Sequence, residues 1–113
     1  MGGGNYSGYL DFEMPVKEDY NNPDTCLSLS FEVTLSSVNP DVLVTVKIGD
    51  IMPVVASSPK GPLVVMNEDG ILGTILSSKE VALLMCIQNG TEYQAKVIRI
   101  VGGECVVRIY AQK

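Results

Sequence analysis

The stretch that decides the fold covers residues 63–110 and reads LVVMNEDGILGTILSSKEVALLMCIQNGTEYQAKVIRIVGGECVVRIY. It contains two pairs of segments rich in β-branched residues, and each pair is joined by a short turn. The first pair, Pro62–Met66 and Ile71–Leu76, meets at Asn67-Glu68-Asp69-Gly70, where the glycine suits a left-handed position. One apolar segment with helix signals at both ends stands between the pairs. We therefore predict a hairpin, a short helix and a second hairpin.

The second hairpin gives the clearest signal, because Gly102-Gly103 forms a two-residue turn between Thr91–Val101 and Glu104–Tyr110. A tight turn sets Val101 opposite Glu104 and fixes the register of the pairs that follow. One face then holds the predicted core residues Ile98, Ile100, Cys105, Val107 and Ile109. The other face holds Tyr93, Val97, Arg99, Glu104, Arg108 and Tyr110.

The helix between the hairpins is predicted over residues 78–89. It starts at the capping-box pattern Ser77-Ser78-Lys79-Glu80 and ends at Asn89-Gly90. Its middle, Val81–Ile87, is apolar around the whole circumference rather than along one stripe. Either the helix is buried in the fold, or one side of it contacts another chain and makes an oligomer.

The preceding part of the chain shows strand patterns. Strict alternation over Leu27–Leu35 predicts a half-buried strand, and we expect a second strand over Val42–Ile48. A third is expected over Ile51–Ala56, with Pro53 indicating an edge or a bulge. About seven short strands and one helix predict a mainly β fold, a small barrel or curved antiparallel sheet built from residues 26–113.

Residues 1–25 are predicted to form a flexible acidic N-terminal arm. They hold five acids and one lysine, a net charge of −4, out of a formal −5 for the chain. The arm also carries six aromatic or large apolar residues, Tyr6, Tyr9, Leu10, Phe12, Met14 and Tyr20. It is therefore either simply disordered, or it docks on the domain or on a neighbour's sheet edge. The rest of the chain is nearly neutral, which is not the basic footprint of most nucleic-acid binders.

The three cysteines, Cys26, Cys86 and Cys105, are an odd number, and two of them stand at apolar positions. This pattern favours reduced core residues in a cytoplasmic protein over a disulfide framework. No secretion signal follows Met1, and no apolar run approaches the length of a membrane span. We therefore predict a cytoplasmic location without membrane insertion.

Residues that carry out chemistry are few. The chain has no histidine, and its cysteines show no C-x-x-C spacing. No glycine-rich loop precedes a helix in the manner of a phosphate site. The sequence predicts a protein that is not an enzyme and that holds no metal and no cofactor.

Residues 64–76, VVMNEDGILGTIL, followed by a helix, Gly90 and a long strand, resemble the later half of a HIRAN domain. The shared pattern is a strand, a turn, Gly-x-x-Gly-x-Ile, a short helix, a glycine and a strand, and it covers residues 63–110. The resemblance implies a small β-barrel similar to an OB fold and the binding of single-stranded DNA ends. It implies the architecture without assigning any binding residue.

Two functions follow as hypotheses. The first is a non-catalytic module for protein–protein interaction, indicated by the neutral domain, the apolar helix and the acidic arm. The second is binding of single-stranded nucleic acid, for which rings beside guanidinium groups form a platform. The candidate binding residues for either function are Tyr93, Arg99, Arg108 and Tyr110. The alternative is that these residues form an ordinary solvated sheet surface.

Overall fold

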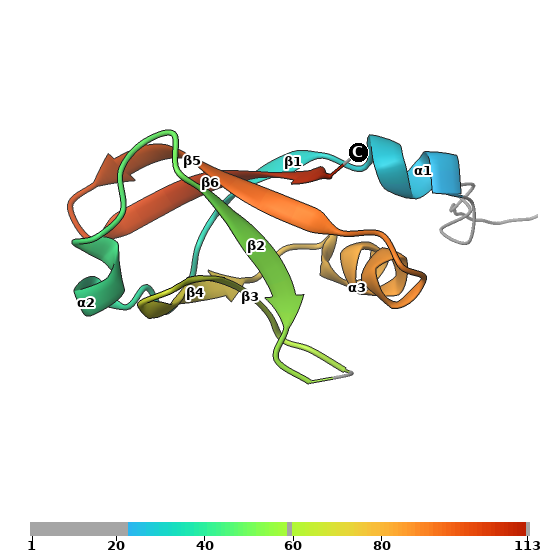
Figure 1. The fold of residues 1–113 in the computed structure, drawn as a ribbon, viewed down its shortest axis with the longest axis horizontal. Helices are drawn as coiled ribbons and strands as arrows, with labels where there is room; N and C mark the ends of the chain where they lie inside the picture. Colours follow the sequence, from blue (N-terminus) through green and yellow to red (C-terminus); the bar gives the residue numbers. More distant parts are fainter. Residues whose placement is uncertain (1–22, 59, 113) are drawn as a thin grey trace, which may run out of the picture.

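The computed structural model describes residues 23–58 and 60–112. Six antiparallel strands form one curled sheet, a half-barrel, in the order β1-β6-β5-β2-β3-β4 (Figure 1). The described part also holds three helices, where the sequence predicted one. The mainly β, curved antiparallel fold is confirmed.

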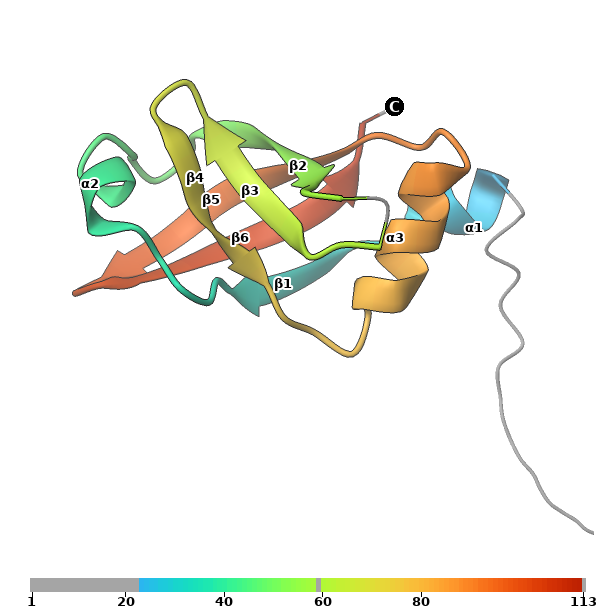
Figure 2. The same ribbon diagram turned by 90° about the horizontal axis from the view of Figure 1, so that it is seen from below.

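In chain order the elements are α1 (Pro23–Ser28), β1 (Phe31–Thr34), α2 (Pro40–Leu43), β2 (Ile51–Ala56), β3 (Leu63–Asn67), β4 (Gly70–Ile75), α3 (Glu80–Gln88), β5 (Tyr93–Val101) and β6 (Glu104–Ala111). Figures 1 and 2 place α2 at one end of the sheet and α1 with α3 at the other. Within the described residues, no helix is long and apolar enough to cross a membrane. The predicted order of hairpin, helix and hairpin is confirmed as β3–β4, α3 and β5–β6.

The curl brings the chain after β1 against β4, although these strands stand at opposite ends of the strand order. Ser36 and Thr74 exchange two backbone hydrogen bonds, each 2.8 Å between nitrogen and oxygen. The approach depends on Gly73, because a Cβ atom there would lie 2.9 Å from the Cβ of Leu35. Glycine is therefore needed where the half-barrel comes closest to closing.

Strand β2 lies in the middle of the sheet, so the prediction of an edge or bulge position for Pro53 is wrong. Pro53 is the last residue of β2 to pair with β5, and Val54 is the first to pair with β3. The proline therefore stands where β2 changes partner. A residue without a backbone N–H is tolerated there because the ladder is already interrupted.

Of two predicted strands in the first half of the domain, one is shorter than predicted and the other is absent. Residues 23–28 form α1, so the strand expected over Leu27–Leu35 is limited to Phe31–Thr34, and Leu27 is 37% exposed. The strand expected over Val42–Ile48 is replaced by α2 and the turns that follow it. The helix-start signal of α2 is local. The Asn39 side chain accepts a hydrogen bond from the N–H of Asp41 at 2.9 Å, and a proline stands in the first turn.

The predicted arm falls mainly on residues 1–22, which lie outside the described residues. Residues 23–25, which we assigned to the arm, begin α1 instead. This short helix packs against β6 and α3. Helix α1 therefore begins three residues before the predicted boundary at residue 26.

Helix α3 covers one end of the core with one side only. Leu83 and Cys86 are completely buried, whereas Val81 is 70% exposed and Met85 is exposed beside it, one turn further along. The helix begins at Glu80, and Ser77 accepts a hydrogen bond from the N–H of Lys79 rather than forming the expected capping box. Burial accounts for one side of the apolar helix, and contact with another chain stays a prediction for the other.

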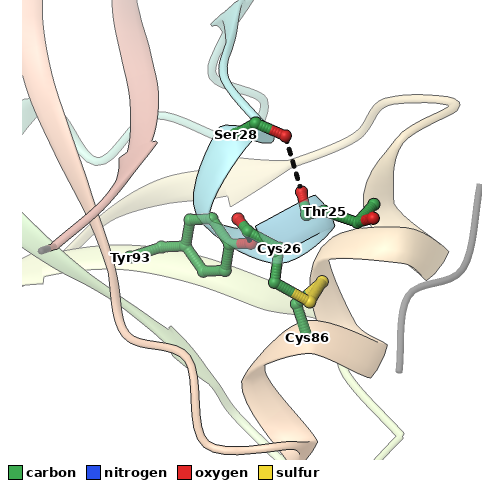
Figure 3. Close-up of a disulfide and its surroundings, with 5 residues drawn as sticks. All are labelled: Thr25, Cys26, Ser28, Cys86 and Tyr93. Atoms are coloured by element: carbon green, nitrogen blue, oxygen red, sulfur yellow. Dashed lines mark hydrogen bonds between the residues drawn. A yellow bond between two sulfur atoms is a disulfide. The ribbon is translucent and has the colours of Figure 1, made fainter. Parts of the chain in front are cut away.

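A disulfide joins Cys26 of α1 to Cys86 of α3, 60 residues apart (Figure 3). The prediction of three reduced cysteines is therefore wrong for this pair, while Cys105 is a buried free thiol as expected. The spacing of cysteines in a sequence does not show which of them the fold brings together. The odd number of cysteines also argued against a disulfide, although two of the three are bonded. Because disulfides persist mainly in oxidising compartments, the prediction of a cytoplasmic location loses the support of the cysteines.

Candidate functional site

The register of β5 and β6 decides which side chains share the outer face of the sheet. Val101 pairs with Glu104 and Arg99 pairs with Val106, as the glycine turn predicted. The register then shifts, because Val97 pairs with Val107 and leaves Ile98 as an extra residue. Such a bulge reverses the inward and outward order of every residue beyond it.

The bulge moves Tyr93 and Val97 into the core, where they are 2% and 0% exposed. The prediction that these two residues lie on the outer face with the arginines is therefore wrong. The Tyr93 hydroxyl donates a hydrogen bond of 2.5 Å to the backbone oxygen of Cys26, and Figure 3 shows its side chain directed at α1. Tyr93 thus helps to hold α1 and offers almost no surface to the outer face.

Three of the five predicted core residues of this hairpin are completely buried. These are Cys105, Val107 and Ile109 on β6. Ile98 and Ile100 on β5 are half-buried, and Ile100 packs against the core. The bulge at Ile98 therefore disturbs the inner face of β5 and leaves that of β6 as predicted.

Four exposed side chains form one line across four strands on the outer face. Cross-strand pairs connect Glu32 of β1 with Arg108 of β6, Arg108 with Lys96 of β5, and Lys96 with Ile51 of β2. Residues paired in this way project on the same face, with Cβ atoms about 5 Å apart. We call this line, Glu32, Arg108, Lys96 and Ile51, the outer row.

The outer row places two cations directly opposite each other. Arg108 forms an ion pair with Glu32, and both side chains are about half exposed. Lys96 stands on the other side of Arg108, and like charges in this position destabilise a sheet. Among the described residues, the side chains of Lys96 and of the exposed Arg99 form no hydrogen bond and no ion pair. The face therefore presents three cations, Lys96, Arg99 and Arg108, and two acids, Glu32 and Glu104.

Tyr110 stands next to the outer row and borders a hollow of about 520 Å³. It pairs with Gln94 on β5 and is half-buried. Leu27 and Ser28 of α1 form another wall of this hollow, so the disulfide-linked helix shapes it. The full lining consists of Leu27, Ser28, Ser30, Gln94, Tyr110, Ala111 and Gln112.

A second hollow, of about 470 Å³, opens where β2 and β3 separate. The two strands pair only over Val54–Ala56 and Leu63–Val65, so β3 leaves β2 beyond Val65. The lining is mostly apolar and consists of Ile51, Met52, Pro53, Met66, Asn67 and Glu68. Because Ile51 belongs both to this hollow and to the outer row, cations and apolar surface adjoin.

The buried thiol of Cys105 is not part of this face. Burial raises its pKa, because removal from water disfavours the thiolate. Within the described residues, no group of three or more carboxylates and thiolates lies close enough together to hold a metal ion. The chemistry that the face offers is charge, one tyrosine ring and apolar surface.

Arg99, Arg108 and Tyr110 lie on the outer face as predicted, whereas Lys96, Ile51 and Glu32 were missed. One signal was present in the sequence: residues 93–97 alternate apolar and polar, and the adjacent apolar pair Val97-Ile98 breaks this alternation. Reading the strand forward from Tyr93 places Lys96 outside. The contributions of Ile51 and Glu32 depend on long-range pairing and have no local signal.

No protein-family model, curated protein or solved structure matches this chain. The resemblance to a HIRAN domain stays a prediction.

Proposed function

We propose that this protein is a non-catalytic module that binds another protein through the outer face of its sheet. The observation that carries the proposal is the direct pairing of Lys96 with Arg108, both exposed on adjacent strands. Like charges in such a pair lower the stability of the sheet. A partner that brings negative charge to this face relieves the repulsion and gains binding free energy from it.

The composition of the face favours a protein as the partner. Arginine, tyrosine and methionine are enriched in protein interfaces, and arginine and tyrosine are frequent hot spots. Here Arg108 and Tyr110 stand on one side of Lys96, and the apolar hollow with Met66 opens on the other side. A cationic strip beside a concave apolar surface suits a partner that inserts one apolar side chain into the hollow and places an acidic side chain beside it.

Binding of single-stranded nucleic acid has less support. The proposed stacking platform had two tyrosines, and Tyr93 is buried in the core. Arg108 already contacts Glu32, and the face adds only Lys96 and Arg99. Because affinity for nucleic acid grows with the number of phosphates neutralised, three cations beside the two acids Glu32 and Glu104 give a weak site.

The test compares two double variants that remove the same charge. Lys96→Ala with Arg108→Ala changes the outer row, and Lys47→Ala with Lys60→Ala removes two exposed lysines from loops outside it. We expect the wild type and the loop variant to capture the same protein from cell extract. The outer-row variant should fail to capture it. Calorimetry with that protein should then show binding at least about tenfold weaker for the outer-row variant, a typical hot-spot loss.

Thermal melting of both variants checks that the fold persists. Capture of the same proteins by all three forms overturns the proposal. Binding of single-stranded DNA at physiological salt, lost in the outer-row variant alone, supports the nucleic-acid alternative in its place.

A further inference from the structure

The chain contains a short segment whose side chains complement the outer face. Residues 10–14, Leu10-Asp11-Phe12-Glu13-Met14, alternate large apolar residues with acids. The segment lies outside the described residues. We propose that the outer face binds this segment of its own chain, so that a protein partner has to displace it. This inference rests on the proposed function of the face.

Charge complementarity is the first argument. Asp11 and Glu13 supply two carboxylates, and the face offers Lys96 and Arg99, whose side chains have no hydrogen-bond or ion-pair partner among the described residues. A carboxylate beside Lys96 also offsets the repulsion from Arg108. The two cations without a side-chain partner therefore complement the charge that this segment carries.

The apolar residues of the segment fit the neighbouring surface. The hollow between β2 and β3 measures about 470 Å³, is mostly apolar, and begins at Ile51, the residue paired with Lys96. A side chain such as Phe12 removes apolar surface from water when it enters such a hollow. In a segment bound in extended form, alternate side chains share a side, so the acids and the apolar residues separate.

The connection to the domain is short enough to favour this contact. The described chain begins in α1, whose Leu27 and Ser28 line the hollow beside Tyr110. Arg108 and Tyr110 are two residues apart on β6, a separation of about 7 Å along the strand. The eight residues 15–22 join the segment to α1 and span up to about 26 Å when extended. A tether of this length gives an effective concentration in the millimolar range, so weak contacts suffice for occupancy.

The test uses the full chain with a spin label at Ser7→Cys. Cys26 and Cys86 are bonded to each other and Cys105 is completely buried, so the new thiol is the one that the label reaches. We expect paramagnetic broadening of the amides of Lys96, Arg108 and Tyr110 in the folded protein. Broadening that is absent from this face overturns the proposal.

Two further variants of the labelled chain have the same change in charge. Asp11→Asn with Glu13→Gln should abolish the broadening, whereas Glu18→Gln with Asp19→Asn should keep it. If both pairs act alike, only general attraction of an acidic segment remains and the proposal fails. A control mixes isotope-labelled protein that has no spin label with spin-labelled protein that has no isotope label. This mixture should show no broadening if the segment binds within its own chain. Broadening in the mixture would mean that a second copy supplies the segment, and it would overturn the proposal.

The outcome separates this inference from the proposed function. Loss of partner binding in the Lys96→Ala, Arg108→Ala variant without any broadening leaves the protein-binding face and removes the self-contact. If the broadening is seen but the Lys96→Ala, Arg108→Ala variant captures the partner as well as the wild type does, the proposed protein-binding function of the face is wrong. If both hold, the Asp11→Asn, Glu13→Gln variant binds the partner several-fold more tightly than the wild type.

Discussion

The two faces of the β5–β6 hairpin are built from the same strands but differ in burial and in charge. The inner face includes six residues that are almost completely withdrawn from water, Tyr93, Ala95, Val97, Cys105, Val107 and Ile109. The outer face exposes Lys96, Arg99 and Arg108 and sets two of these cations directly opposite each other. The inner face is arranged for stability, whereas the outer face keeps an arrangement that lowers stability. That difference is the basis of the proposal that the outer face binds a partner.

The largest expected effect comes from deleting a side chain of the inner face. Ile109→Ala removes methyl and methylene groups from a completely buried position and should lower the free energy of unfolding by about 2–5 kcal/mol. Arg108→Ala, on the neighbouring outward position, removes an exposed ion pair and should cost less than about 1 kcal/mol. Urea denaturation measures both. Equal losses would mean that the outer face is structural.

The parts of the fold that the sequence predicted depend on local signals. The turn at Gly102-Gly103 and the helix stop at Asn89-Gly90 depend on backbone conformations that neighbouring residues determine. The hairpins and α3 therefore appear within a few residues of the predicted bounds. The alternation over Leu27–Leu35 was equally clear, yet α1 takes its first part, where a disulfide to Cys86 and packing against β6 hold the chain.

The candidate site shows the same division. Arg99, Arg108 and Tyr110 were placed correctly because they lie near the turn or on the strand without the bulge. Tyr93 was misplaced because one extra residue, Ile98, reverses the order beyond it. The outer row needs pairings of β1 with β6 and of β2 with β5, which join residues far apart in the sequence. Periodicity within one strand contains no information about such pairs.

A smaller loss is expected from removing one hydroxyl of the inner face. Tyr93→Phe keeps the ring and leaves the backbone oxygen of Cys26 without this donor, which should cost about 1–2 kcal/mol. Tyr110→Phe, a hydroxyl of the half-buried residue on the outer face, serves as the control and should change stability by less than about 0.5 kcal/mol. Thermal melting at neutral pH compares them. No loss in Tyr93→Phe would show that this contact does not stabilise α1.

The buried thiol of the inner face should make stability depend on pH. Burial raises the pKa of Cys105, so the unfolded chain releases this proton at lower pH than the folded chain does. Above the ordinary thiol pKa of about 8.5 the unfolded state therefore binds fewer protons, and stability falls as pH rises. The slope for one proton is at most about 1.4 kcal/mol per pH unit.

Cys105→Ala removes this titration. The difference in free energy of unfolding between the wild type and the variant should be constant below about pH 8 and should shrink above about pH 8.5. Urea denaturation at a series of pH values measures the difference. A gap that stays constant to pH 10 would show that Cys105 has the same pKa in the folded and unfolded states.

The smallest expected effect is the most direct measure of the outer face, and it has the opposite sign. Lys96→Gln removes one of two like charges on paired residues, so it should raise the free energy of unfolding by a few tenths of a kcal/mol. Lys60→Gln, on an exposed loop, removes the same charge away from the outer row and serves as the control. Raising salt from about 0.01 M to 0.1 M shortens the screening length from about 30 Å to 10 Å, so the gain from Lys96→Gln should decrease at the higher salt. A variant that is less stable than the wild type at both salt concentrations would show that the Lys96 stem stabilises the sheet by packing on Ile51, and the repulsion would then no longer distinguish the outer face from the inner one.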